Sequence, residues 1–335
     1  MTVDRSALQA ATAATRSSTT TNPAAAPAPA RRLEFGFAPP PGDREMGPIR
    51  RATYVRDLDT QLRFVVQHFS SVWTSDHVME HANYRHECWT QLAWIAARHP
   101  EPLLGTCVLA NSYRNPALMA KMAASLQELS GGRLIFGIGA GWLEEEYRGY
   151  GWEFPSTRER IEQLEEALRL TKTLWTDSPA NFEGRWYRLE NAYCEPRPNP
   201  APPIMIGGDG EKYLLRVVAQ HADWWFSYAS APQVLARKIA ALADHCRDVG
   251  RDITQIRMAT PLTVYLGRTM AEARAMAGDL PPSERPPFVG DPAAFRDRLA
   301  ELHALGFELV EMRFARLFEI DDVELFVDRV LPHFR

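Results

Sequence analysis

Hydrophobic residues fall into short continuous runs that alternate with longer segments of helical period. From residue 33 onward the short runs are mostly apolar throughout, as expected of parallel strands that are covered on both faces. Each run except the last is followed by a segment in which apolar residues recur at helical spacing. The eight predicted strands span residues 33–38, 71–75, 103–109, 134–139, 204–206, 223–228, 256–266 and 309–314.

Three of the predicted helices have recognisable first residues. Each begins with a side chain that can cap the first turn, followed by Pro or by a Glu that completes a capping box. These starts are Ser156 with Glu159, Asn115 before Pro116, and Asp291 before Pro292. Alternation of strand and helix repeated eight times predicts an α/β fold, a (β/α)8 TIM barrel, with a doubly wound sheet as the alternative.

Two segments interrupt this alternation. The first thirty residues contain ten Ala, six Thr, three Pro and three Ser, and they offer too little apolar area to offset the entropy of ordering. Residues 1–32 are therefore predicted to form a disordered tail, and residues 33–335 a single barrel. Residues 176–203, after the fourth helix, are too long for a plain loop, which indicates an insertion with short secondary structure of its own.

Charge and composition narrow the class of protein. The 335 residues carry a formal net charge of −4; the first 32 hold four Arg and one Asp, so the remaining 303 have a charge of −7. An acidic domain without a Lys/Arg excess excludes nucleic acid as the main partner. No apolar stretch approaches the roughly 18 residues of a membrane span. The four cysteines form no C-x-x-C pair, so we expect a cytoplasmic protein in a reducing compartment.

The carboxyl ends of the strands carry the active site in such barrels, so the residues after each strand are the candidates. Asp76 and His77 follow the second strand. This pair can orient an imidazole for proton or hydride chemistry; the alternative is a turn-capping Asp beside a surface His. After the third strand, Asn111 is a polar residue placed where a ligand would lie. Cys107 has no basic neighbour that would activate its thiol, which favours a buried apolar role.

A glycine-rich turn follows the fourth strand. Gly137, Gly139 and Gly141 are spaced by two, which lets the backbone approach a planar or phosphorylated ligand closely. The spacing does not match the dinucleotide fingerprint, because the third glycine comes one residue early. The acidic residues 144–146 that follow are expected to form the solvated start of a helix.

A second glycine-rich turn follows the fifth strand. Gly207, Gly208 and Gly210 surround Asp209 where a strand gives way to a helix. Bare backbone N–H groups at the positive end of a helix suit a phosphate, whereas a simple tight turn is the alternative. The required Gly-Lys-Ser/Thr of a Walker loop is missing.

Two other kinds of site are disfavoured. His77, His81 and His86 lie near Glu80 and Glu87, and these residue types bind zinc. Metal-dependent barrel hydrolases usually gather ligands from several strands, often starting with H-x-H on the first, and the first predicted strand has no His. No metal is therefore expected. The absence of G-x-S-x-G excludes a serine nucleophile elbow.

Several segments together resemble one known family. They are SDHV at residues 75–78, NSYRNPALMAKMAASLQELSGGRLIFGIGAGWLEEEYRGYG from residue 111, FEGRWYRLENAYCEPRP from residue 182, PPIMIGGDGEKYLLRVVAQHADWW from residue 202 and FVGDPAAFRDRLAELHALGFELVEMRF from residue 288. In this order they resemble the luciferase-like monooxygenase superfamily of TIM barrels, and in particular its coenzyme F420-dependent oxidoreductase branch. The resemblance extends from about residue 33 to the end of the chain.

The resemblance implies a deazaflavin or flavin that lies across the carboxyl-end mouth of the barrel. It implies a catalytic His77 near the reactive face of the ring, with Asp76 holding its tautomer. Cys107-Val108 matches a bulge that often contains a non-prolyl cis peptide behind the ring, and Asn111 matches a residue beside the ring or ribityl chain. The residues implied along the cofactor and around its phosphate are Gly139, Gly141, Gly207, Gly208, Asp209 and Gly210.

The implied activity is hydride transfer between coenzyme F420 and a small organic substrate, with His77 as proton donor or acceptor. The first alternative is an FMN-dependent monooxygenase that uses oxygen and reduced flavin from a separate reductase. The second alternative is a non-catalytic flavin-binding homologue, which the presence of both Asp76 and His77 disfavours. Homodimerisation is common in the family and is expected here, whereas the identity of the substrate stays open.

Overall fold

The computed structural model describes residues 32–39, 48–80, 83–229, 231–280, 283, 285–316 and 318–335; the predicted tail, apart from Arg32, lies outside them. Within this part, parallel strands close a barrel in the order β10-β12-β1-β2-β3-β5-β8-β9, and β9 pairs with β10. The predicted (β/α)8 barrel is confirmed, with every strand where an apolar run predicts one. The barrel strands are β1 (Glu34–Phe37), β2 (Ser71–Thr74), β3 (Leu103–Thr106), β5 (Leu134–Gly139), β8 (Ile204–Gly207), β9 (Trp224–Phe226), β10 (Arg257–Leu266) and β12 (Phe307–Phe314).

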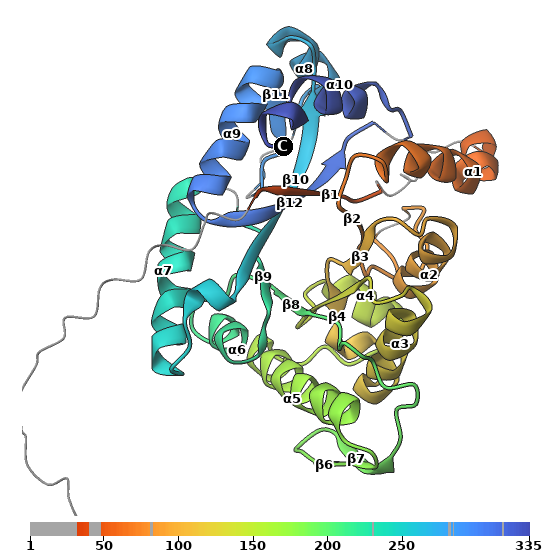
Figure 1. Cartoon of the computed structure of the whole chain (residues 1–335), viewed down its shortest axis with the longest axis vertical. Helices are drawn as coiled ribbons and strands as arrows, with labels where there is room; N and C mark the ends of the chain where they lie inside the picture. The colour runs from red at the N-terminus through yellow and green to blue at the C-terminus, as the bar shows by residue number, and fades with distance from the viewer. Residues whose placement is uncertain are drawn as a thin grey trace, which may run out of the picture. The chain divides into compact units, whose positions relative to one another are not determined.

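Helices alternate with these strands along the chain and surround the barrel (Figure 1). Their starts follow the predicted signals: Ser156 and Glu159 form the capping box of α5, and Asn115 and Asp291 cap α3 and α9. The barrel helices are α1 (Pro48–Val65), α2 (Cys88–Arg98), α3 (Pro116–Leu129), α5 (Thr157–Thr176), α6 (Leu214–His221), α7 (Pro232–Asp248), α9 (Pro292–Ala304) and α10 (Asp321–Arg329).

Short elements are added to this repeat. The third predicted strand is interrupted and continues as β4, and a short strand, β11, extends the barrel sheet beside the end of β10. These additions are β4 (Leu109–Ala110), η1 (Asn111–Tyr113), α4 (Glu144–Gly149), β6 (Ala180–Glu183), β7 (Arg188–Ala192), η2 (Ile253–Gln255), α8 (Met270–Ala277), β11 (Phe288–Gly290) and η3 (Leu331–His333).

The interior of the barrel is filled by side chains from alternate strand positions. A buried cluster that includes Trp73, Phe226 and Leu309 lies there. Val310, the neighbour of Leu309, belongs instead to the large core that also contains the helices. Because alternate residues of a strand face the same side, Glu311 follows Leu309 on the inner side, toward the carboxyl end of β12.

The insertion after the fourth barrel helix folds into a hairpin. β6 and β7 pair antiparallel and lie beside α5 at the lower end of the molecule in Figure 1, which confirms the predicted short structure. The carboxylate of Glu166, a buried residue of α5, accepts hydrogen bonds of 2.7–2.9 Å from the backbone N–H groups of Arg185, Trp186 and Tyr187. This contact fastens the hairpin turn to α5.

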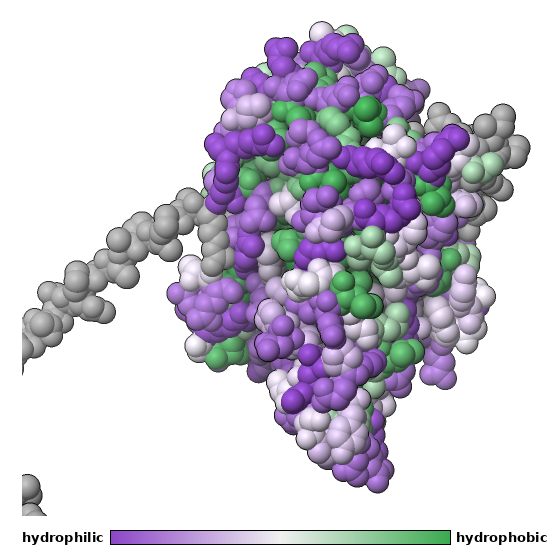
Figure 2. All heavy atoms as spheres, turned by 45° about the vertical axis from the view of Figure 1, so that its right-hand side comes forward, coloured by the Kyte–Doolittle hydropathy of each residue, from purple (hydrophilic) through white to green (hydrophobic). Residues whose placement is uncertain are grey.

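The surface carries no extended apolar area in the view of Figure 2, where hydrophilic residues predominate and apolar residues form small separate groups. Large exposed hydrophobic side chains are scattered along the described chain; examples are Leu129, Trp142 and Tyr193. None of the helices in the described ranges is long and apolar enough to cross a membrane.

Candidate functional site

Asp76 lies at the carboxyl end of β2 and is almost fully buried. Its carboxylate accepts a hydrogen bond of 3.0 Å from the Ala110 N–H and forms a bidentate ion pair with Arg114 at 2.7 and 2.8 Å. Arg114 also donates to Glu87, the residue that caps α2. Asp76 therefore joins the end of β2 to the segment after β3. The resemblance implies that the His77 imidazole donates a hydrogen bond to Asp76, and this bond is not formed in the described structure.

Glu146, and not Asp76, is the carboxylate that hydrogen-bonds to His77. The imidazole Nδ1 lies 2.9 Å from Oε2 of Glu146. The same Oε2 accepts a hydrogen bond from the Tyr113 hydroxyl at 2.6 Å, and Oε1 accepts one from the Met79 N–H at 3.0 Å. Burial alone would raise the pKa of Glu146, but these hydrogen bonds outweigh it and hold the pKa below its usual value. An ionised Glu146 only accepts, so Nδ1 carries a proton and Nε2 is left as the basic nitrogen.

The sequence predicts a solvated run at residues 144–146, and this is wrong for Glu146. Glu144 is exposed, whereas Glu146 and its neighbour Tyr147 are fully buried. Gly141 allows the approach: its φ is +77°, and a Cβ there would lie 1.9 Å from the Tyr147 hydroxyl. The pairing with His77 joins residues 69 positions apart, which no local pattern reveals.

The segment after β3 confirms one feature that the resemblance implies, because the peptide bond between Cys107 and Val108 is cis. The Val108 side chain lies between two predicted glycines. A Cβ on Gly139 would lie 2.9 Å from Cγ2 of Val108, and a Cβ on Gly207 would lie 2.7 Å from its Cγ1. The segment after β3 and the carboxyl ends of β5 and β8 therefore meet at this side chain. Burial raises the pKa of the Cys107 thiol well above its ordinary value, which agrees with a buried, unreactive residue.

Asn111, the first residue of η1, is buried at the same mouth. Its Nδ2 donates to the Tyr187 hydroxyl of the insertion at 3.2 Å, whereas its Oδ1 has no partner. A buried acceptor without a donor is unfavourable. The position therefore suits a ligand with a ring N–H or a hydroxyl, in agreement with the role that the resemblance implies for Asn111.

The turn after β8 offers free donors. The backbone N–H groups of Asp209, Gly210 and Glu211 make no hydrogen bond within the described chain. Gly208 has a φ of +134°, a conformation open mainly to glycine, and α6 begins four residues after Gly210, at Leu214. Consecutive free amides of this kind suit an anion such as phosphate.

The side chain of Asp209 has a different task from its amide. Its carboxylate accepts from the Ser227 hydroxyl at 2.6 Å and from the Tyr228 N–H at 2.9 Å, so it ties the turn to the end of β9. Lys238 donates to the Asp209 carbonyl at 2.7 Å and brings a positive charge beside the turn. The predicted phosphate contact of Asp209 thus rests on its backbone alone.

No group of three or more His, Cys, Asp or Glu side chains in the described residues is arranged to hold a metal ion. Glu80 pairs with Arg85, and Glu87 caps α2. His81 lies outside the described residues. Glu80 and Glu87 are thus engaged in structural contacts, whereas Nε2 of His86 has no hydrogen-bond partner within the described residues.

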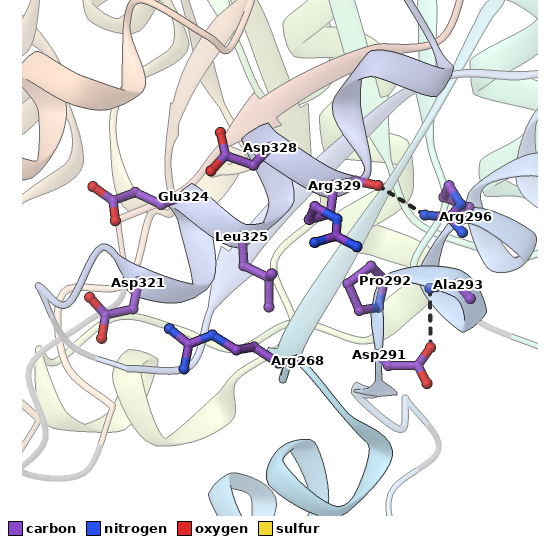
Figure 3. Close-up of a pocket in the computed structure, with 10 residues that line it drawn as sticks. All are labelled: Arg268, Asp291, Pro292, Ala293, Arg296, Asp321, Glu324, Leu325, Asp328 and Arg329. Atoms are coloured by element: carbon purple, nitrogen blue, oxygen red, sulfur yellow. Dashed lines mark hydrogen bonds between the residues drawn. The ribbon is translucent and has the colours of Figure 1, made fainter.

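Two cavities of the described structure differ in their position relative to the barrel. A cavity of about 610 Å³ lies outside the barrel, between α9, α10 and the ends of β10 and β11 (Figure 3). Charged side chains such as Arg268 and Asp321 surround it, and none of the predicted site residues lines it. A smaller cavity of about 200 Å³ opens inside the mouth, lined by residues of β9, β10 and β12 together with Cys107. Its position at the carboxyl ends of the strands is the one that function requires in this fold.

Comparison with known proteins agrees with this geometry. The family model described as luciferase-like monooxygenase matches residues 67–325, and the chain belongs to this family. It is 40% identical over 151 residues to the F420-dependent glucose-6-phosphate dehydrogenase of Kineococcus radiotolerans, which covers 43% of this chain and 44% of the relative. The enzyme of the same name from Nakamurella multipartita is 29% identical over 274 residues, 78% of each chain. The FMNH(2)-dependent dimethylsulfone monooxygenase of Pseudomonas fluorescens is 25% identical over 328 residues, 87% of this chain and 86% of the relative.

Solved structures show the same fold. An F420-dependent secondary alcohol dehydrogenase in complex with an F420-acetone adduct superposes with a TM-score of 0.73 at 18% identity, over 91% of this chain and 99% of that chain. An EDTA monooxygenase from Chelativorans superposes with a TM-score of 0.76 at 16% identity, over 91% and 94%. The barrel and the family resemblance are confirmed, and the matched relatives include both the deazaflavin and the flavin kinds.

Proposed function

We propose that the protein is an oxidoreductase that binds coenzyme F420 and transfers a hydride between the deazaflavin and a small alcohol or carbonyl substrate. The observation that carries the proposal is the His77–Glu146 pair at the barrel mouth, in which Nε2 is left as the basic nitrogen. Relatives named as F420-dependent dehydrogenases support the choice of cofactor.

The residues at the mouth fit a bound deazaflavin. The unpartnered Oδ1 of Asn111 suits a donor on the ring or the chain attached to it, and the free amides of Asp209, Gly210 and Glu211 suit its phosphate. Val108 would support the ring. When bound, coenzyme F420 supplies a carbon centre that accepts or gives a hydride.

The side chains of this protein handle the proton. Oxidation of an alcohol releases a hydride from carbon and a proton from the hydroxyl oxygen, and Nε2 of His77 accepts that proton. Glu146 keeps Nδ1 protonated and stabilises the imidazolium that results. In the reverse direction the imidazolium returns the proton to the carbonyl oxygen as the hydride reaches its carbon.

Calorimetric titrations of the full chain with oxidised F420 and with FMN test the proposal. F420 should bind at least about tenfold more tightly than FMN. A tenfold preference for FMN would favour the monooxygenase alternative, which the long alignment with the Pseudomonas relative supports. Binding of F420 without reduction of the cofactor by glucose 6-phosphate or 2-propanol, and without its reoxidation by acetone, would favour the non-catalytic alternative.

A further inference from the structure

The cavity of about 200 Å³ in the mouth contains a buried carboxyl group that the proposed reaction does not use. Glu311 of β12 is only 2% exposed, and its Oε1 has no hydrogen-bond partner. No ion pair connects Glu311 to a described side chain; Arg313, which also lines the cavity, is not paired with it. Leaving such a group unsatisfied in a barrel interior is unfavourable, which points to a ligand.

We propose that this cavity is part of the substrate subsite and that Glu311 binds an uncharged substrate oxygen there, other than the reacting oxygen whose proton His77 handles. The inference rests on the proposed function only in taking the substrate to be an alcohol or carbonyl. Glu311 would then be a specificity-determining residue, distinct from the proton-handling pair of His77 and Glu146.

The surroundings favour a neutral Glu311. Burial raises its pKa above the ordinary value, and Arg313 only partly opposes this. Arg285 covers the cavity with its guanidinium 4.6 Å from the centroid of the Tyr228 ring, where it makes a cation–π contact. A neutral carboxyl group has one O–H that donates to a substrate oxygen, and its other oxygen accepts from a substrate hydroxyl.

The rest of the lining fits a compact, partly apolar molecule. Phe226, Leu262 and Pro286 provide apolar walls, and Cys107 lies at the side of the cavity toward β3. The lining beside Glu311 also has polar groups, which come from Tyr228, Thr263, Arg285 and Arg313. A site that hydrogen-bonds a substrate oxygen through a buried group rejects analogues that lack this oxygen, because the buried group is then left unpaired. Glu311 therefore selects for an oxygen on the substrate, and the apolar walls select for its size.

Two substitutions of Glu311 test whether its hydrogen-bonding groups, and not a negative charge, bind the substrate. Glu311→Gln keeps an N–H donor and an acceptor of nearly the same shape, whereas Glu311→Leu removes both. Cyclohexanol, cyclohexylamine and cyclohexanecarboxylate are titrated by calorimetry into the F420-loaded protein as neutral, cationic and anionic probes of one ring. Glu308→Gln, on the same strand but paired with Arg257 outside the cavity, is the matched control.

We expect wild type to bind cyclohexanol, Glu311→Gln and the control to bind it within about threefold, and Glu311→Leu to lose at least about tenfold. Glu311→Leu should also unfold at a temperature equal to or above that of wild type, because it removes an unsatisfied buried group. The inference is overturned if wild type prefers the amine or binds none of the probes. It is also overturned if Glu311→Leu binds cyclohexanol as tightly as wild type, or if the carboxylate binds and Glu311→Leu leaves that binding unchanged. If wild type binds no F420, the proposed function fails, and the same titrations on unloaded protein still decide the role of Glu311.

Discussion

Nδ1 of His77 and Oε2 of Glu146 lie 2.9 Å apart, although the two residues follow different strands and are 69 positions apart in the sequence. Because Glu146 is buried and accepts two further hydrogen bonds, its position is set by the scaffold. The imidazole is therefore held in one tautomer at the mouth of the barrel.

Glu146→Gln should lower kcat by about tenfold to a hundredfold, because an amide cannot stabilise the imidazolium by charge. Affinity for F420 should stay within about twofold of wild type, measured by calorimetric titration beside steady-state turnover. Glu144→Gln, exposed at the start of the same helix, is the control and should leave kcat unchanged. An unaltered kcat in Glu146→Gln would rule out this role.

His77→Ala should lower turnover by about 10²-fold or more and leave cofactor affinity largely intact, because the proton acceptor is lost while the predicted cofactor contacts remain. His333→Ala, an exposed histidine near the end of the chain, serves as the control. Steady-state turnover and F420 titration provide the two measurements. Retention of wild-type turnover by His77→Ala would contradict the assignment.

Arg114→Met should lower the free energy of unfolding by about 3 kcal/mol, because it leaves Asp76 buried without its ionic partner. Urea unfolding measures the change. Arg148→Met, an exposed arginine paired on the surface with Glu144, should change stability by no more than about 0.5 kcal/mol. Equal effects of the two substitutions would show that the Asp76–Arg114 pair contributes no more to the free energy of unfolding than an exposed ion pair.

Asp322 should make stability depend on pH. Burial raises its pKa to about 6, although Arg316 lies 3.7 Å away. Between about pH 4 and 6 the folded state keeps a proton that the unfolded state has released, so the free energy of unfolding falls as pH rises. Asp322→Asn should therefore add about 1–2 kcal/mol at about pH 7.5 and little at about pH 4, measured by urea unfolding.

The exposed Asp321→Asn provides the control for that experiment and should show no such difference between the two pH values. An equal gain for Asp322→Asn at both pH values would mean that the buried charge is not the cause.

Local signals in the sequence are enough to predict the barrel, because strands and helix starts are determined by interactions within a few residues. The apolar runs mark its strands, and the caps at Asn115 and Ser156 mark helix starts without reference to distant parts of the chain. The glycine turn after β8 is likewise recognisable, since its free amides follow from local backbone geometry.

The partners within the site could not be predicted in the same way. Glu146 belongs to an acidic run that is typical of a solvated helix start, and only the packing of α4 against the segment after β2 and against η1 buries it. The ion pair between Asp76 and Arg114 joins two loops 38 positions apart. Glu311 lies within a strand that also carries Glu308 and Arg313, and only closure of the barrel directs it into a cavity.

The contact between Glu166 and the hairpin turn has a consequence for how this protein can diverge. The carboxylate binds three consecutive backbone amides, so this contact does not depend on which side chains the turn carries. The sequence and length of the hairpin arms are therefore free to drift while the loop stays anchored, and Tyr187 stays within reach of Asn111. Changes in the hairpin can therefore bring new side chains to the mouth while the anchoring contact and the barrel stay the same.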